Sequence, residues 1–290
     1  MVASNPTDWR LVGWQGRPDT LATSSGVPNQ IATAEYPSDP NEHYSMTIIP
    51  KKIHYVWFGG KPKPPMILDT IESWRRVLPD YEIIGWTEKN YNIEADPWMK
   101  SMHDQGKYAF ASDYARLHIL QEHGGIYLDT DVEIKKPFDP FLGEGMLWGF
   151  EYDCYLATCV IGSRPGQPLL KLLLADYEGR ENAPINNALV TRFFLRHFPE
   201  FRLNNTEQRL EGGIRIMPKE YFSVPSFNSS ANFCRHHGSN LWREGGKGGS
   251  RVKRVVRRML GEVLYFKLAA WNVCRRNEFL PILKEHRRLK

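Results

Sequence analysis

After residue 53 the spacing of apolar positions changes several times, and each change predicts a new element. Residues 53–58 (IHYVWF) are a short run of β-forming residues that ends at two glycines. Residues 66–77 then show the spacing of an amphipathic helix, and residues 81–87 are a second β-forming run. Strand, helix and strand in this order are typical of a βαβ unit. The pattern therefore predicts an α/β protein with a largely parallel sheet.

The alternation of helix and strand continues towards the C-terminus. A long helix is expected over residues 108–123, because Gly124-Gly125 is a strong stop signal for a helix. Residues 126–134 are expected to form the next strand. Further strands are expected at 146–151 and 156–162, helices at 167–177 and 187–197, and a strand with a turn at 212–224.

Composition divides the chain into three segments. Residues 1–46 are rich in Pro, Ser, Thr, Asn and Asp and have no sustained periodicity, so we expect an extended or disordered arm. Residues 47–244 hold all the predicted α/β elements and form the expected catalytic domain. Residues 245–290 begin with a GGKGG joint and continue as a basic tail.

The tail concentrates the positive charge of the protein. Residues 251–290 carry a net charge of +9, whereas the other 250 residues carry −4. Apolar residues from Val252 to Leu264 recur on one helical stripe, which predicts a basic amphipathic helix. Such a helix suits an anionic membrane surface, although its stripe could instead dock on the catalytic domain. No nucleic-acid recognition module accompanies the basic residues, so no nucleic-acid partner is expected.

The four cysteines are sparse and form no CxxC pair or metal-ligand ladder. This usage favours a reducing compartment. The alternative considered is a disulfide between Cys154 and Cys159. Together with the basic tail, the cysteines predict a cytoplasmic protein on the inner face of a membrane.

Residues 124–131 (GGIYLDTD) carry the clearest chemical signal. If they continue as one strand, alternate side chains share a face, which places Tyr127, Asp129 and Asp131 together. Two carboxylates on one face repel each other unless a divalent cation lies between them. Mg²⁺ and Mn²⁺ prefer one or two carboxylates plus substrate phosphates. A solvated turn, or the acid and nucleophile of a glycosidase, are the alternatives.

A second polar pair lies on the preceding helix. Asp113 and Arg116 are three residues apart and are therefore neighbours on one helical face. They could form a simple surface salt bridge. Beside a diphosphate-sugar, Arg116 would instead offer a forked donor for phosphate or sugar oxygens, and Asp113 would accept from sugar hydroxyls.

Two long motifs together resemble the DXD sugar transferases of glycosyltransferase family 32. The chain has S-D-x-x-R-x-x-x-L-x-x-x-G-G-I-Y-L-D-x-D at residues 112–131 and I-P-K-x-I-H-x-x-W-x-G at residues 49–59. The family includes capsule and O-antigen enzymes and the yeast initiating α-1,6-mannosyltransferase, and it is distantly related to the glucosylating toxins of clostridia. The resemblance covers residues 48–242. It implies a GT-A type fold, which is a Rossmann-like, mostly parallel mixed sheet flanked by helices.

The resemblance also implies the parts of a donor site. Val56 and Trp57 would hold the nucleobase, with Trp57 stacking on it. Asp131 would ligate the metal directly, and Asp129 would contact the metal through water as well as the nucleotide-sugar. The residues expected around the ribose, sugar and phosphates are Ser112, Asp113, Arg116 and Tyr127.

Near the end of the expected domain, His236, His237 and Trp242 are similar to the H-H-x-x-x-S-W motif of the family, with Leu241 in place of its Ser. The resemblance implies that His236 and Trp242 close over the diphosphate, and His236 is a candidate metal ligand.

Asn186 and Asn187 open a predicted helix. We expect one to cap the helix and the other, taken as Asn187, to contact the transferred sugar.

The resemblance implies retention of anomeric configuration. No carboxylate stands out as a nucleophile, so a front-face reaction is favoured, in which the leaving phosphate helps to deprotonate the acceptor. The donor is expected to be a UDP-sugar, with GDP-mannose as an option. The expected acceptor is a saccharide, lipid-linked, in surface polysaccharide synthesis. The rival hypotheses are a metal-independent glycoside hydrolase using Asp129 and Asp131, and a non-catalytic carbohydrate- or membrane-binding protein.

Overall fold

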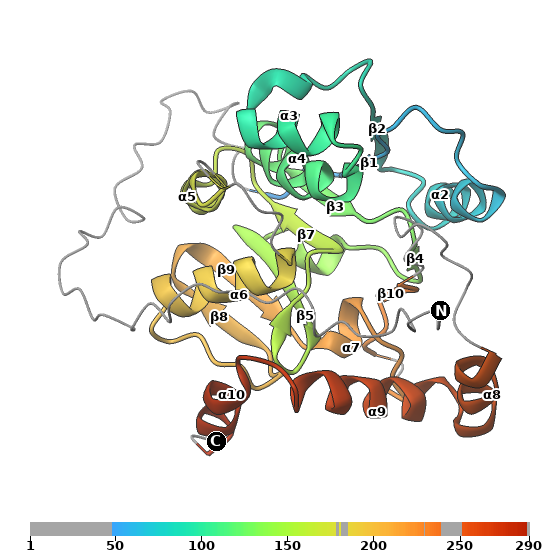
Figure 1. The fold of residues 1–290 in the computed structure, drawn as a ribbon, viewed down its shortest axis with the longest axis vertical. Helices are drawn as coiled ribbons and strands as arrows, with labels where there is room; N and C mark the ends of the chain where they lie inside the picture. The colour runs from blue at the N-terminus through green and yellow to red at the C-terminus, as the bar shows by residue number, and fades with distance from the viewer. Residues whose placement is uncertain (1–47, 178–179, 181–184, 229, 239–250, 289–290) are drawn as a thin grey trace, which may run out of the picture. The chain divides into compact units, whose positions relative to one another are not determined.

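A mixed eight-stranded sheet lies at the centre of the protein and is flanked by helices (Figure 1). The computed structural model describes residues 48–177, 180, 185–228, 230–238 and 251–288. The predicted arm over residues 1–46 and the proposed contact of Trp242 lie outside these residues. All the described residues belong to one compact unit.

The main sheet has the strand order β2-β1-β3-β7-β5-β9-β8, with β6 paired to β5. β1 is parallel to β2 and β3, and β5 is parallel to β9, whereas β7, β8 and β6 are antiparallel to their neighbours. Five strands therefore run in one direction and three in the other, as the α/β prediction requires. The strands are β1 Lys52–Val56, β2 Glu82–Trp86, β3 Gly125–Leu128, β5 Met146–Tyr152, β6 Tyr155–Leu156, β7 Val160–Ser163, β8 Gln208–Leu210 and β9 Ile214–Met217.

A separate two-stranded sheet pairs β4 (Val132–Ile134) with β10 (Cys234–His236). The helices are α2 Pro65–Val77, α3 Pro97–Asp104, α4 Tyr108–His123, α5 Pro168–Ala175, α6 Asn186–His197, α7 Lys219–Phe222, α8 Arg251–Leu260, α9 Glu262–Cys274 and α10 Leu280–His286. Short 3₁₀ turns occur at Ile93–Ala95, Asp139–Phe141 and Glu211–Gly213.

Helix α4 ends at the two glycines, as predicted, and the reason is steric as well as conformational. Gly124 and Gly125 both have positive φ, at 60° and 97°. A Cβ on Gly125 would lie 2.8 Å from His54 Nε2 and from the carbonyl oxygen of Lys52. Glycine therefore lets the chain leave α4 and enter β3 directly against β1.

The expectation of one strand over residues 126–134 is wrong. β3 ends at Leu128, and the chain turns through Asp129–Asp131 before β4 begins at Val132. The turn is closed by a hydrogen bond from the Val132 amide to the Asp129 carbonyl, at 3.0 Å. The two aspartates are therefore brought together by a turn rather than by alternation on a strand. Residues 156–162 are likewise divided between β6 and β7.

Helix α2 packs against this turn. Its buried residues Ile67, Ile71 and Trp74 recur at the spacing of one helical face. The indole N–H of Trp74 donates to the Val132 carbonyl at 2.7 Å. The helix predicted from periodicity thus supports the backbone that carries the DXD residues.

The C-terminal segment contains two helices where the sequence predicts one over residues 252–264. Gly261, with φ of 70°, separates α8 from α9. α9 lies beside β5 (Figure 1), and a disulfide joins Cys274 at its end to Cys154. The cysteine interpretation is therefore corrected: Cys154 has a partner far away in sequence, and Cys159 is free and buried. No helix within the described parts of the chain is both long enough and apolar enough to cross a bilayer.

Candidate functional site: a carboxylate–histidine cluster

The site forms where two parallel strands end side by side. β1 and β3 pair in register at Ile53–Ile126 and His54–Tyr127. Val56 and Trp57 at the end of β1 therefore lie next to the turn that follows β3. The carboxyl ends of parallel strands are where open α/β sheets bind their ligands.

Asp129, Asp131 and His236 form a group able to hold a metal ion. One possible ligand atom from each residue lies within 4.8 Å of the others. β10 pairs antiparallel with β4, which sets His236 opposite Val132 and thus beside Asp131. The Nε2 atom of His236 lies 3.3 Å from Asp131 Oδ1. Two carboxylates and an imidazole are donors that fit Mn²⁺, and the carboxylates also fit Mg²⁺.

His236 has a second acidic neighbour that the sequence analysis missed. Its Nδ1 atom lies 3.2 Å from Oε1 of Glu151, near the end of β5. Burial opposes the charge on His236, but Cys159, Glu151 and Asp131 outweigh it, so the pKa of the imidazole is raised well above its usual value. Glu151 thus holds the ring by one nitrogen while the other faces Asp131. No short motif marks Glu151, because β5 reaches His236 only in the folded protein.

Glu151, Cys159 and His236 form a second group whose possible ligand atoms lie close together. Cys159 is buried, and burial raises the pKa of its thiol to about 11. A thiol must lose its proton to ligate a metal. The group that contains both aspartates is therefore the better cation site.

The guanidinium group of Arg116 lies between the carboxylates of Asp113 and Asp129. Its guanidinium lies 2.7 Å from Asp113 Oδ1 and 3.4 Å from Asp129 Oδ1, and it donates to the Thr158 carbonyl at 2.7 Å. It also lies over the ring of Tyr127, 4.7 Å from the centroid. The side chain is only 5% exposed. Burial opposes its charge, but the surrounding acidic groups, Asp129 first, outweigh burial and raise the pKa of Arg116.

Asp113 is held from two sides. Asn186 donates its amide to Asp113 Oδ1 at 2.9 Å, and Tyr177 in turn donates its hydroxyl to Asn186. Burial raises the pKa of Asp113 to about 7, with Arg116 opposing the rise and Asp129 adding to it. Of the neighbouring asparagines, the structure therefore brings Asn186 to the carboxylate.

Asn186 and Asn187 do not cap helix α6, as the sequence analysis expected of one of them. The N-cap of α6 is Ile185, and no side chain caps the helix, so the capping expectation is wrong. Asn187 accepts a hydrogen bond from the Thr158 hydroxyl at 3.2 Å. Because the Thr158 carbonyl also accepts a hydrogen bond from Arg116, Asn187 lies close to the guanidinium group of Arg116.

Of the expected nucleotide-contacting residues, Tyr127 contacts the cluster directly, whereas Trp57 and Ser112 have backbone partners of their own. Trp57 is partly buried, and its indole N–H donates to the Lys61 carbonyl at 2.7 Å. Ser112 donates to the Ala109 carbonyl within α4 at 2.7 Å. Tyr127 donates to Asp129 Oδ1 at 3.1 Å, so the tyrosine supports the first aspartate of the motif.

Comparison with known proteins identifies the family. Residues 64–148 match the model of the glycosyltransferase sugar-binding region containing the DXD motif. The chain is 30% identical over 171 residues to an uncharacterized glycosyltransferase of Acanthamoeba polyphaga mimivirus, a match that covers 54% of this chain and 68% of that protein. The protein therefore belongs to the DXD-containing glycosyltransferases, and the family resemblance drawn from its motifs is confirmed.

Other relatives match more locally. Inositol phosphoceramide mannosyltransferase 1 of Schizosaccharomyces pombe is 30% identical over 145 residues, which cover 45% of each chain. The chain thus spans less than half of that protein. Among solved structures, the PaToxG glycosyltransferase is similar with a TM-score of 0.43 and 21% identity, covering 55% of this chain and 75% of that one.

Proposed function

We propose that the protein is a retaining, metal-dependent hexosyltransferase that moves a sugar from a nucleotide-sugar to a saccharide acceptor. The observation that carries the proposal is the grouping of Asp129, Asp131 and His236 beside the ends of β1 and β3. A bound Mn²⁺ or Mg²⁺ would supply positive charge to the diphosphate leaving group. Asp131 and His236 are the proposed direct ligands, with Asp129 acting through water and on the donor.

The buried side chains would do the positioning. Arg116 holds Asp113 and Asp129 at fixed places, and Asn186 holds Asp113 from the opposite side. We propose that Asp113 accepts from hydroxyls of the sugar, because an acceptor held in place orients the donor at no further conformational cost. The favoured scheme is front-face transfer, in which the leaving phosphate takes the proton of the acceptor hydroxyl. An inverted product would contradict it.

The proposed donor is a UDP-sugar, with GDP-mannose as the second candidate. Trp57 and Val56 are proposed to hold the nucleobase, and Trp242 and His236 to close over the diphosphate. The name of the fission yeast relative specifies transfer of mannose to a lipid. That name supports both the mannose alternative and a lipid-linked acceptor, here proposed to serve surface polysaccharide synthesis.

We also propose that the C-terminal helices attach the enzyme to an anionic membrane. Leu264, Leu268 and Trp271 on α9 recur at helical spacing and are 47%, 54% and 61% exposed. The segment containing them carries the net charge of +9. A short apolar helix among cations suits an interfacial position, with the helix lying along the membrane surface. The cytoplasmic face remains the proposed side, and the Cys154–Cys274 disulfide weighs against it because such bonds are rare in the cytosol.

A panel of nucleotide-sugars tests the catalytic proposal. The purified protein is incubated with each sugar, with Mn²⁺ or with a chelator, and release of nucleotide is measured. We expect release from one donor, only with metal, and loss of that release in Asp131→Asn. A metal-independent glycoside hydrolase would release sugar from a saccharide without any nucleotide, and a non-catalytic binding protein would keep its binding in Asp131→Asn.

A further inference from the structure

A cavity of about 540 Å³ lies beneath α9, between α9, α10, α7 and the turn that joins β5 to β6. Its volume is within the range of small-molecule sites. Five cationic and two acidic side chains line it, which leaves an excess of positive charge. The cations are Lys219, Lys267, Arg275, Lys284 and Arg287, and the acidic residues are Asp153 and Glu220.

Both acidic residues form ion pairs with cations that also line the cavity. Asp153 forms ion pairs with Lys219 and with Arg287. Glu220 lies 3.4 Å from Lys219. Lys267 and Lys284 are exposed, and across the described parts of the chain neither forms an ion pair. Both acidic side chains of the cavity are therefore paired, while Lys267 and Lys284 remain available to an anion.

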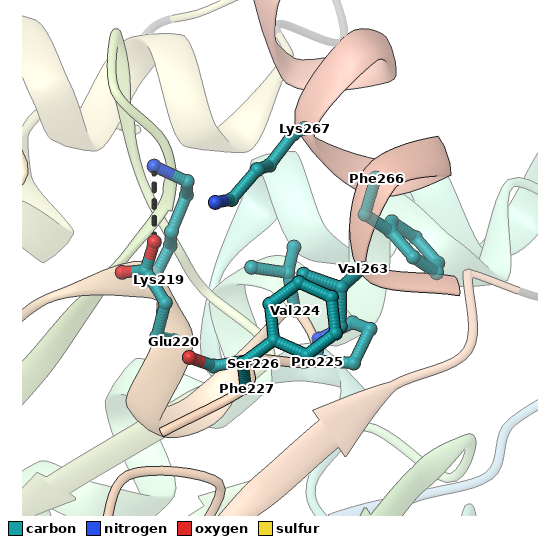
Figure 2. Close-up of a pocket in the computed structure, with 9 residues that line it drawn as sticks. All are labelled: Lys219, Glu220, Val224, Pro225, Ser226, Phe227, Val263, Phe266 and Lys267. Atoms are coloured by element: carbon teal, nitrogen blue, oxygen red, sulfur yellow. Dashed lines mark ion pairs between the residues drawn. The ribbon is translucent and has the colours of Figure 1, made fainter. Parts of the chain in front are cut away.

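A smaller cavity of about 120 Å³ adjoins the first and shares Lys219, Glu220 and Lys267 with it. Its other walls are mainly apolar. Figure 2 shows the amino groups of Lys219 and Lys267 on one side of this cavity and the side chains of Val263 and Phe227 on the other. Phe227 is 77% exposed, so the apolar part opens to the surface. A ligand that fills both cavities would have an anionic end and an apolar end.

α9 is tied at each end to a segment that carries the cation site. Glu262 at its start pairs with Arg235, the residue before His236. Cys274 at its end is bonded to Cys154, three residues after Glu151. A molecule held along α9 is therefore held next to the two strands that supply Glu151 and His236.

We propose that the two cavities bind the phosphate group and the first apolar segment of a membrane lipid that carries the acceptor. The cations around Lys267 would take the phosphate, and the apolar wall at Val263 and Phe227 would take the lipid chain. This assignment rests on the proposed transferase function and names the part of its acceptor that is recognised. The exposed apolar stripe of α9 is the side from which a lipid in a bilayer would reach the site.

The experiment compares vesicle binding of the full chain and of variants. Phosphatidylcholine vesicles contain either phosphatidate, whose headgroup is a bare phosphate monoester, or phosphatidylserine, which is also anionic but whose phosphate is a diester covered by serine. We expect the protein to prefer the phosphatidate vesicles. Removing both exposed lysines, Lys267→Ala with Lys284→Ala, should lower affinity for them about 25-fold, or about fivefold for each cation, and abolish the preference.

Arg275→Ala and Arg276→Ala form a matched pair, because both arginines follow α9 and only Arg275 lines the cavity. Arg275→Ala should reduce the preference for phosphatidate, whereas Arg276→Ala should weaken binding to both vesicles equally. A preference that survives in the lining variants, or that never appears, overturns the assignment.

Two further arms separate the possible outcomes. Soluble short-chain phosphatidate should compete for binding, and inorganic phosphate at the same concentration should not. Equal competition would mean a site for free phosphate and would refute the lipid assignment.

Metal-dependent nucleotide release without acceptor is measured in the same variants and should be unchanged. If the unaltered protein releases no nucleotide from any donor, the transferase proposal fails, whereas normal release without a phosphatidate preference refutes the lipid site alone.

Discussion

Glu151 Oε1 lies 3.2 Å from Nδ1 of His236, while Nε2 of the same ring lies 3.3 Å from Asp131. A carboxylate that accepts from one ring nitrogen fixes the tautomer and turns the other nitrogen towards a metal. We therefore predict that Glu151→Gln weakens Mn²⁺ binding about tenfold or more, measured by electron paramagnetic resonance of free Mn²⁺.

The control for Glu151 is a second glutamate–histidine pair nearby. Glu133 lies 3.4 Å from His237, outside the carboxylate–histidine cluster. Glu133→Gln should leave Mn²⁺ affinity within a factor of two of the parent, roughly the effect of an exposed pair. Equal losses in the two variants would mean that Glu151 has no special role.

Asp131→Asn should remove metal-dependent turnover, because it replaces a charged ligand with a neutral one of the same shape. The proposed loss in kcat/KM is about a hundredfold or more, comparable with removal of a charge-stabilising group from other enzymes. The measurement is nucleotide release over a Mn²⁺ titration, with thermal unfolding as the check on folding. A variant that keeps full turnover in the presence of a chelator would refute the metal assignment.

Arg116→Lys tests whether the forked guanidinium group is needed, because the substitution keeps the positive charge. Lysine keeps the positive charge but cannot bond Asp113, Asp129 and the Thr158 carbonyl together. We expect a loss of about 3 kcal/mol in the free energy of unfolding, the usual result of breaking a buried ion pair. Urea unfolding measures it, and Arg75→Lys, whose partner Glu72 is exposed, is the control.

His54 predicts a pH dependence of stability. The ring is fully buried, donates from Nε2 to the Gly124 carbonyl and accepts from Trp86 at Nδ1, so it is held neutral. Burial lowers the pKa of His54 to about 4. The unfolded chain, with a pKa near 6.5, binds more protons between these values, so stability is lost as pH falls through that window.

The expected loss for His54 is about 2 kcal/mol between pH 7.5 and pH 5. Urea unfolding at the two pH values measures it. His54→Gln should remove that part of the pH dependence even if it lowers stability at both values. A parent protein and variant with the same slope would show that other groups cause the loss.

The Cys154–Cys274 disulfide closes a loop of 120 residues between the catalytic body and α9. Cross-links over such loops stabilise proteins by roughly 2–4 kcal/mol. Reductant should therefore lower the free energy of unfolding by about that amount, and Cys154→Ser should make the protein insensitive to reductant. Alkylation of protein taken directly from cells, followed by mass spectrometry, measures whether the pair is oxidised there and so tests the proposed cytoplasmic face.

Local features were predictable because neighbouring residues decide them. The bounds of α4 follow from periodicity and from the two glycines that end it, and α2 follows from the spacing of Ile67, Ile71 and Trp74. The family was also readable, because its two motifs are continuous stretches of chain. Asp129 and Asp131 were chosen from the second of these motifs and His236 from the short histidine motif near the end of the domain, and the fold brings all three together.

Tertiary structure decided everything that depends on the meeting of distant segments. Glu151 reaches His236 from 85 residues away, Asn186 reaches Asp113 from 73, and Cys154 meets Cys274 from 120. No local pattern distinguishes these residues, since each gains its partner only when β5, α6 and α9 pack on the rest of the protein. The sequence by itself determined which residues carry the DXD chemistry; packing determined which other side chains hold them in place, because burial and hydrogen bonding act through space rather than along the chain.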